Sequence, residues 1–417
     1  EHLRRRGRVE ARSAVLLALL AALLAAPATA QADFRNYESA QVHPIRLSAD
    51  GTRLFAVNTP DGRLEVYGLA DPSHPVLLRD IPVGLEPVSV TPRTNDEVWV
   101  VNNLSDSVSV VSVSAGRVVA TLRVKDEPAD VAFAMGKAFV TASASDEVHV
   151  FDAQTRASLG TVSIAGKDPR ALAVAPGGGS VYVLVHRSGN GTTLIREQQA
   201  PPPPPPTGPL PAAPSQGIIV RADDPNWSHV VSLSLPDEDV FEISASSLQV
   251  MRTFSSVGTI LFDLAVHPQS GDLFVAGTDA RNLVRFEDAL QSHTIDSRVT
   301  RVTPGPSPTV QPFDLNPGFT YANLPNQGER ALALAEPTGI ALDAAAGRLY
   351  VAAHGTDRIG VLDLAGNVLA RIEVGDATGG QLDTLNKRGP RGLAFHASAQ
   401  RLYVLNRLSH SIAVIDT

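Results

Sequence analysis

The stretch VWVVNNLSDSVSVVSV, residues 98–113, has the pattern of a β-hairpin. An apolar run ends at Asn102 and Asn103, a short polar link follows, and alternation of apolar and polar residues then resumes. Alternation with a period of two predicts strands, and a short polar link between two such runs predicts a hairpin. The same arrangement returns in LFAVNTPDGRLEVYGL (54–69), LYVAAHGTDRIGVLDL (349–364) and LYVLNRLSHSIAVIDT (402–417).

An aromatic residue opens the second strand of each repeated unit. Seven such residues occur, and the first four are separated by 44, 40 and 43 residues: Phe55, Trp99, Phe139, Tyr182, Phe274, Tyr350 and Tyr403. Repeats of this length with four strands each are typical of β-propeller blades. We therefore predict an all-β, seven-bladed β-propeller of four-stranded antiparallel blades, with an open array of β-sandwiches as the alternative.

Two features recur in the first strand of the units. Proline is expected at the start of this strand, because the first residue of a strand can lack an amide donor. The prolines at this position are Pro87, Pro128, Pro169, Pro337 and Pro390. A small residue follows within the strand, as expected for an inner strand packed close to the axis: Ser48, Thr91, Ala132, Ala173, Ala265, Ala341 and Ala394.

The seventh unit stops after its third strand, so the last blade is predicted to be incomplete. Its fourth strand would come from residues after Thr417 or from the N-terminus, and the poor alternation of residues 32–41 favours the first source. We therefore expect the chain to be part of a longer protein. Two insertions are predicted, at about 189–236 in unit four and about 288–330 in unit five, because both ranges are rich in proline.

The N-terminus predicts export. Five arginines and two glutamates accompany an apolar run from Ala14 to Ala26, and an Ala-x-Ala site ends at Ala30. This is the pattern of a secretory signal peptide over residues 1–30, which leaves residues 31–417 for the propeller. The predicted location is periplasmic or secreted, without a membrane span after cleavage. Removing the leader's charge of +3 from −8 leaves −11, which disfavours nucleic acid as a partner.

The repeats resemble the YVTN-type β-propeller family. The resemblance rests on WVVNN (99–103), YVLN (403–406) and the unit LYVAAHGTDRIGVLDL with its following NVLARIEVG, and the repeats cover nearly the whole mature chain. Other units depart from the asparagine, which favours a local turn role for that residue. The resemblance implies a binding protein of the bacterial exterior. Some relatives join a propeller to a C-terminal c-type cytochrome domain.

No catalytic motif and no metal-binding motif was found in the sequence, and the absence of cysteine excludes a Cys-x-x-Cys-His haem attachment within the chain. The candidate ligand-binding residues lie where the D–A and B–C links of a propeller meet the tunnel. They are Arg46, Asp130, Arg170, Asp263 and Arg391 from the first strands, with Asn102, Asn103, His354 and Asn406 from the B–C links. The alternative interpretation of the acidic residues near the prolines is that they solvate turns.

These observations favour a non-catalytic, exported binding module without a cofactor in this chain. Its partner would be a protein or a small polar ligand at the tunnel face. The alternative is the propeller part of a periplasmic redox enzyme with a cytochrome c domain in cis. A minor alternative is a lactonase-like hydrolase, although we find no matching catalytic set of residues.

Overall fold

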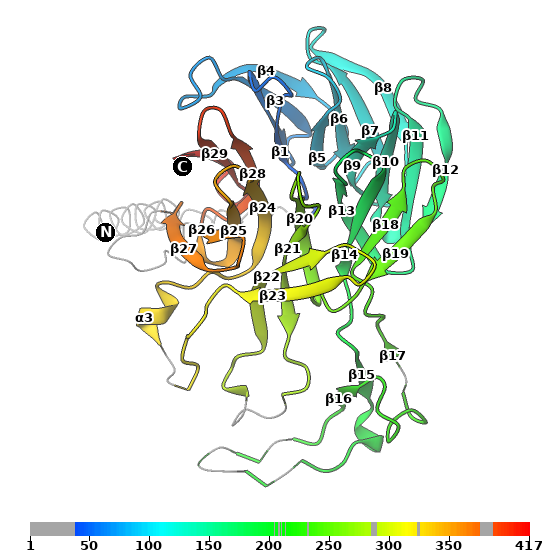
Figure 1. The fold of residues 1–417 in the computed structure, drawn as a ribbon, viewed down its shortest axis with the longest axis vertical. Helices are drawn as coiled ribbons and strands as arrows, with labels where there is room; N and C mark the ends of the chain where they lie inside the picture. Colours follow the sequence, from blue (N-terminus) through cyan, green and yellow to red (C-terminus); the bar gives the residue numbers. More distant parts are fainter. Residues whose placement is uncertain are drawn as a thin grey trace, which may run out of the picture. The chain divides into compact units, whose positions relative to one another are not determined.

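The computed structural model describes residues 38–417 apart from 204, 207–208, 210, 213, 232, 285–289, 323–325 and 376–386. The predicted signal peptide, residues 1–30, lies outside the described residues. Residues 39–417 form one compact unit. Seven antiparallel blades, two of them joined in one sheet, surround a common axis in this unit, so the predicted seven-bladed propeller is confirmed (Figure 1).

In blades one to six, strands A to D follow one another from the axis outward. Blades one to three contain β1 (Ile45–Leu47), β2 (Arg53–Asn58), β3 (Arg63–Gly68), β4 (Val76–Pro82), β5 (Pro87–Pro92), β6 (Glu97–Asn102), β7 (Ser107–Ser112), β8 (Arg117–Arg123), β9 (Pro128–Ala134), β10 (Lys137–Ala142), β11 (Glu147–Asp152) and β12 (Ser158–Ser163). Short 3-10 turns, Ser143–Ser145 and His354–Thr356, form the B–C links of blades three and six.

The remaining blades follow the same plan. They contain β13 (Lys167–Val174), β14 (Ser180–Arg187), β18 (Val240–Ser244), β19 (Val250–Phe254), β20 (Ile260–Val266), β21 (Leu273–Ala280), β22 (Ile295–Thr303), β23 (Thr309–Asp314), β24 (Pro337–Asp343), β25 (Arg348–Ala353), β26 (Arg358–Asp363), β27 (Val368–Glu373), β28 (Pro390–His396), β29 (Arg401–Asn406) and β30 (Ser411–Asp416). Blade seven has three strands, as predicted. One pairing, Arg187 with Ile260, links the sheets of blades four and five.

The segment between β14 and β18 forms a small sheet of its own. It contains β15 (Thr192–Ile195), β16 (Ile218–Arg221) and β17 (Leu233–Ser234) in the order β16-β15-β17, with a 3-10 turn at Glu197–Gln199. A separate apolar cluster of Ile195, Ile218 and Val220 holds this sheet together.

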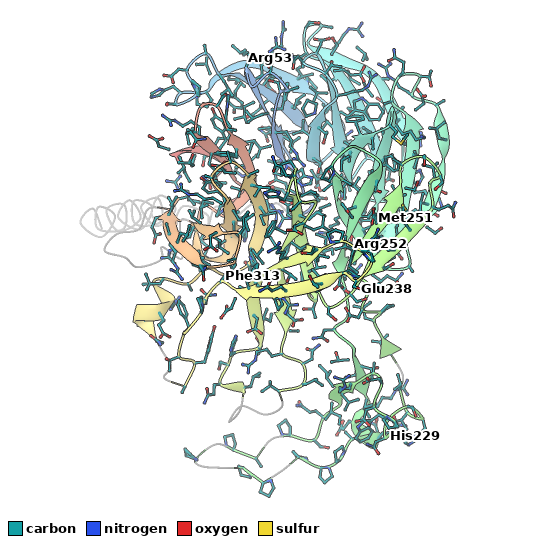
Figure 2. All side chains as sticks on the ribbon, viewed as in Figure 1. Arg53, His229, Glu238, Met251, Arg252 and Phe313 are labelled. Carbon is teal, nitrogen blue, oxygen red and sulfur yellow. The ribbon has the colours of Figure 1, made fainter. Side chains whose placement is uncertain are left out.

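The expected insertion at 288–330 requires a correction. Residues 295–303 and 309–314 are not inserted but form β22 and β23, strands C and D of blade five. The prolines in this range argued against strands. Pro312, however, lies in the outermost strand, where the missing amide donor interrupts no hydrogen-bond ladder between strands. Phe313 of β23 is buried between blades five and six (Figure 2). The short helix α3 (Gln327–Arg330) follows on the way to β24.

The recurring aromatic residues cover the faces between blades. Each lies in strand B, is at most 4% exposed and packs against the next blade in the ring. Trp99 of blade two, for example, shares a cluster with Val131 and Ala138 of blade three. The last aromatic, Tyr403 of blade seven, packs against Ile45 and Leu54 of blade one and thereby closes the ring.

The D–A turns explain the recurring prolines and acids. The residue before each proline has a left-handed backbone: Glu86, Glu127, Asp168, Glu336 and Gly389. Its carbonyl accepts a bond from the B–C link of the same blade, as Glu86 does from the Asn103 amide at 2.9 Å. The proline carbonyl accepts a second bond from the B–C link of the preceding blade, such as Ser143 Oγ to Pro169 at 2.8 Å. Each turn therefore fastens neighbouring blades.

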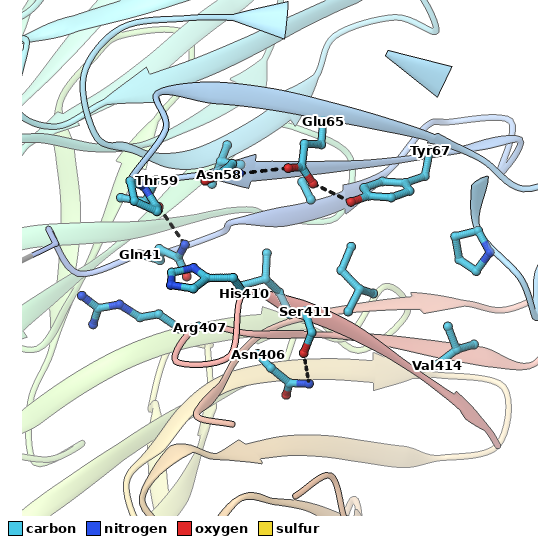
Figure 3. A pocket seen from close by; sticks show the side chains of 16 residues that line it. Gln41, Asn58, Thr59, Glu65, Tyr67, Asn406, Arg407, His410, Ser411 and Val414 are labelled. Carbon is cyan, nitrogen blue, oxygen red and sulfur yellow. Dashed lines mark hydrogen bonds between the residues drawn. The ribbon is translucent and has the colours of Figure 1, made fainter. Parts of the chain in front are cut away.

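The described residues supply three strands to blade seven, and a groove lies between blades seven and one. Each of the other six blades has two apolar residues at the end of strand D, two or three positions apart. These residues pack into the apolar cluster between that blade and the next one, as Leu122 and Val124 do. The blade seven–blade one cluster contains no such pair. A groove of about 230 Å³ lies there instead, lined by Tyr67, Ile412 and Val414 among others (Figure 3). The side chains of β30 are half-exposed, whereas those of β7 are mostly buried.

We predict that adding a strand D to blade seven stabilises the protein. A copy of residues 365–374, which supply strand D of blade six, would be appended after Thr417. Burial of the copies of Ile372 and Val374 should raise the free energy of unfolding by about 2 kcal/mol in urea titrations. The matched control carries serine at both copied positions and should gain little. An equal gain from both versions would contradict the assignment of the groove.

Candidate functional site: the central tunnel

Strand register identifies Arg46 as the unusual residue of the tunnel wall. The residue paired with the strand-B aromatic is small in six blades: Thr91, Ala132, Ala173, Ala265, Ala341 and Ala394. In blade one this place, opposite Phe55, belongs to Arg46. The expected Ser48 instead lies in the A–B turn, where its hydroxyl bonds Asp50 at 2.6 Å. A single guanidinium thus occupies a layer of six small side chains.

A cavity of about 630 Å³ opens along the second half of the inner strands. All seven strands A contribute to its wall. Most of the lining side chains are small, aliphatic or aromatic, including Phe133, Leu172 and Phe395, but polar atoms make up the larger part of the exposed surface. Arg46 and His43 are its cationic residues. The Nε atom of Arg46 is buried without a hydrogen-bond partner. The cavity lies toward the A–B turns, so it occupies the tunnel end opposite the one that the sequence pattern indicated.

The His43 cluster, made of His43, Asp130 and Asp263, crosses the tunnel beneath this cavity. His43 Nδ1 lies 2.7 Å from Asp130 Oδ2, and Nε2 lies 2.8 Å from Asp263 Oδ1. All three residues are at most 7% exposed. The carboxylates also accept backbone bonds from blades four and six, from Leu172 N at 2.8 Å and Ile340 N at 3.0 Å. The cluster therefore joins five blades at the axis.

The two carboxylates hold His43 in its charged form. Burial and the nearby Arg46 lower the pKa of His43, but Asp130 and Asp263 outweigh both and raise it from 6.5 to about 9. In the imidazolium both ring nitrogens donate, which matches the two acceptors. The predicted ligand-binding residues Asp130 and Asp263 are thus engaged by His43 and by backbone amides.

Arg170 and Arg391 lie at the other end of the tunnel, where the D–A and B–C links meet (the D–A end). Arg170 makes a two-pronged pair with Asp168, with both distances 2.9 Å. Arg391 is 5% exposed, and its Nε donates to the carbonyl of Gln41 at 2.6 Å. The predicted residue His354 lies on the B–C link of blade six, 3.3 Å from Glu336.

The three predicted asparagines serve the blade framework. Asn102 is fully buried; it donates to Ser107 and Ser109 and accepts from the amide of Gly84 at 3.1 Å. Asn103 donates to the carbonyl of Pro128 in the next blade at 3.1 Å. Asn406 is 2% exposed and donates to Ser411 at 3.3 Å. These bonds use the amides locally, in agreement with a turn role.

Sequence reasoning missed the part that His43 plays. His43 gave no local signal, because its bonding partners stand 87 and 220 residues away in the sequence. The signal that could have revealed this role is that Asp130 and Asp263 stand at equivalent positions in two inner strands. Two acids in equivalent positions near the axis require a cation between them.

The described part of the chain contains no cluster of metal ligands and no membrane-spanning helix. No three or more His, Asp or Glu side chains in this part gather in a way that could hold a metal ion. None of its helices has the length and apolar character needed to cross a membrane.

Comparisons with known proteins support the fold. A family model described as "Lactonase, 7-bladed beta-propeller" matches residues 333–417, which form blades six and seven. Among solved structures, a chain of Kuenenia stuttgartiensis hydrazine synthase superposes with a TM-score of 0.67 at 18% identity, covering 92% of this chain and 98% of that one. The β-propeller domain of Myceliophteria thermophila Cps50 (Swd1) gives 0.58 at 8% identity, with coverages of 92% and 99%. No curated protein sequence matches significantly.

We predict that the His43 cluster makes stability depend on pH. Since the folded-state pKa lies above the unfolded value, the stabilisation is complete below pH 6.5 and is lost as pH rises through about 9. The free energy of unfolding should fall by about 3 kcal/mol over this window in urea titrations.

The variant His43→Gln should be less stable at pH 6, because two buried carboxylates lose their cation, and it should lack this pH slope. His74→Gln removes an exposed histidine that also pairs with an aspartate, and it should keep the slope. A wild-type stability that stays flat between pH 6.5 and 9 would disprove the assigned charge state.

Proposed function

We propose that the chain is an exported, non-catalytic binding module of the YVTN propeller type whose ligand occupies the central cavity. The observation that carries the proposal is a cavity of about 630 Å³ with one guanidinium, Arg46, in its wall of small and apolar residues. Ligand pockets are commonly about 300–1,000 Å³, mostly apolar, with a few polar groups that fix orientation. The basic leader and apolar run of residues 1–30 support a periplasmic or secreted location.

The cavity favours an organic anion with an apolar body. Arg46 lines the cavity, and no described residue accepts a hydrogen bond from its guanidinium, so a carboxylate in the cavity would satisfy donors that otherwise lack a protein partner. His43 is already bonded through both nitrogens and has no donor left for the ligand. The aromatic and aliphatic wall would cover the ligand's apolar part.

The proposal includes no resident cofactor or metal, and no nucleic acid or membrane partner. The mature chain's net charge of −11 would repel polyanionic surfaces, whereas a single half-buried arginine still attracts a small anion at short range. A small ligand is favoured over a protein partner because the polar group lies inside a cavity and not on a broad surface.

We predict that benzoate binds the full chain and that benzyl alcohol, its uncharged counterpart, binds at least about tenfold more weakly, because only the carboxylate accepts a charge-assisted bond from Arg46. Isothermal titration calorimetry would measure both affinities. Arg46→Gln should remove the preference for benzoate. Arg53→Gln, which changes an arginine that bonds the carbonyl of Asn95 outside the tunnel, is the matched control and should keep it. Equal binding of both compounds, or unchanged benzoate binding by Arg46→Gln, would disprove the proposal.

A second candidate function is lactone hydrolysis, favoured by the family match over residues 333–417. The test is incubation of the purified chain with a panel of aliphatic and aromatic lactones while hydrolysis is followed by acid release. A binding module predicts no turnover above buffer. Turnover that Arg46→Gln abolishes would make the cavity an active site and replace the first proposal.

A further inference from the structure

Arg391 reaches across the tunnel at its D–A end. It is the second residue of β28 in blade seven, and its guanidinium carbon lies 5.4 Å from the centre of the Phe262 ring in blade five. Its only hydrogen bond within the described residues runs from Nε to the Gln41 carbonyl. Arg391 is 5% exposed as a whole residue, and its two terminal nitrogens have no acceptor among the described residues. Burying a cation in this way is costly unless an anion or acceptor completes it.

The neighbouring acids do not neutralise Arg391. No described carboxylate lies within 4.0 Å of its nitrogens, since Asp168 pairs with Arg170 and Arg187. Asp263 accepts from His43, Leu264 and Ile340. Glu336 is 61% exposed and contacts His354. Burial and then the nearby Arg170 and Arg407 lower the pKa of Arg391 to about 9, so it stays charged at neutral pH within a locally positive region.

His186 adds a hydrogen-bond acceptor beside the same aromatic ring. Its ring centre lies 5.2 Å from that of Phe262, and Nδ1 lies 2.8 Å from the Leu261 carbonyl. Because a carbonyl only accepts, Nδ1 carries the proton, and Nε2 of the neutral ring can accept. Burial and Arg170 lower the pKa of His186 to about 4, so the ring is neutral at pH 7.

We infer that the D–A end is a second anion site, which takes a small oxyanion that also carries a hydroxyl group, such as hydrogen phosphate. Arg391 binds the anionic oxygens through its terminal nitrogens, and the hydroxyl donates to His186 Nε2. Phe262 fixes the guanidinium by stacking. The His43 cluster lies between this site and the Arg46 cavity, since Asp130 and Asp263 precede the first cavity-lining residues of their strands, Val131 and Leu264. The inference is therefore independent of the function proposed for that cavity.

The test is calorimetric titration of the full chain with phosphate and with sulfate at pH 7, where sulfate has no hydroxyl. We expect saturable phosphate binding in the millimolar range or tighter, with sulfate about tenfold weaker because it leaves the His186 acceptor unused. His186→Phe should make the two anions equal. Arg391→Gln should abolish binding of both, and Arg391→Lys should weaken it, since lysine keeps the charge but loses the planar fork. Arg53→Gln is the control and should bind like the wild type.

Thermal unfolding gives a second readout, because a ligand of the native state raises Tm. Phosphate should raise the Tm of the wild type and leave that of Arg391→Gln unchanged. If Arg391→Gln does not fold, Arg391→Lys and Phe262→Leu keep the test decisive, and both should bind phosphate more weakly. The inference is overturned if neither anion binds at millimolar concentration, or if these variants bind phosphate like the wild type.

Discussion

Every blade of this protein has two apolar faces, and only a neighbouring blade can cover each of them. A small sheet cannot exclude water from both sides, so the burial that stabilises one blade requires the next. The strand-B aromatics meet this requirement at each of the seven interfaces, ending with Tyr403 of blade seven against blade one. The hydrogen bonds from B–C links to the following proline carbonyls then fix the angle between blades. The tunnel follows from the closed ring.

The ring brings charges together at its axis that lie far apart in the sequence. His43, Arg46 and Arg391 place three cations along the tunnel, and Asp130 and Asp263 place two carboxylates between them. Both carboxylates bond His43, and among the described residues Arg46 Nε and the terminal nitrogens of Arg391 have no acceptor. This excess of positive charge along the tunnel of a negatively charged protein is the physical basis for the anion binding that we propose at both tunnel ends.

The candidate site differs from the expected one because of which groups pair. Asp130 and Asp263 were expected to face a ligand, and they bond His43 and backbone amides instead. The asparagines of the B–C links bond their own turns and the next blade. Arg46 remains a candidate, but it lines a cavity at the opposite end from the links. Long-range partners decided the roles of the two aspartates, whereas the turn role of the asparagines follows from neighbours in the sequence.

The sequence by itself determined the repeated hairpins, the number of blades and the incomplete last blade, because period-two alternation, turn residues and marker aromatics are local signals. The sequence pattern did not predict β22 and β23, because proline usually argues against a strand. Proline is tolerated in an edge strand such as β23, but which strand lies at an edge is known only once the sheet has formed. Only the tertiary structure decided that Arg46 shares a layer with Thr91 and Ala132 and that His43 meets two aspartates. Register and closure of the ring set those contacts, and both depend on burial summed over all seven blades.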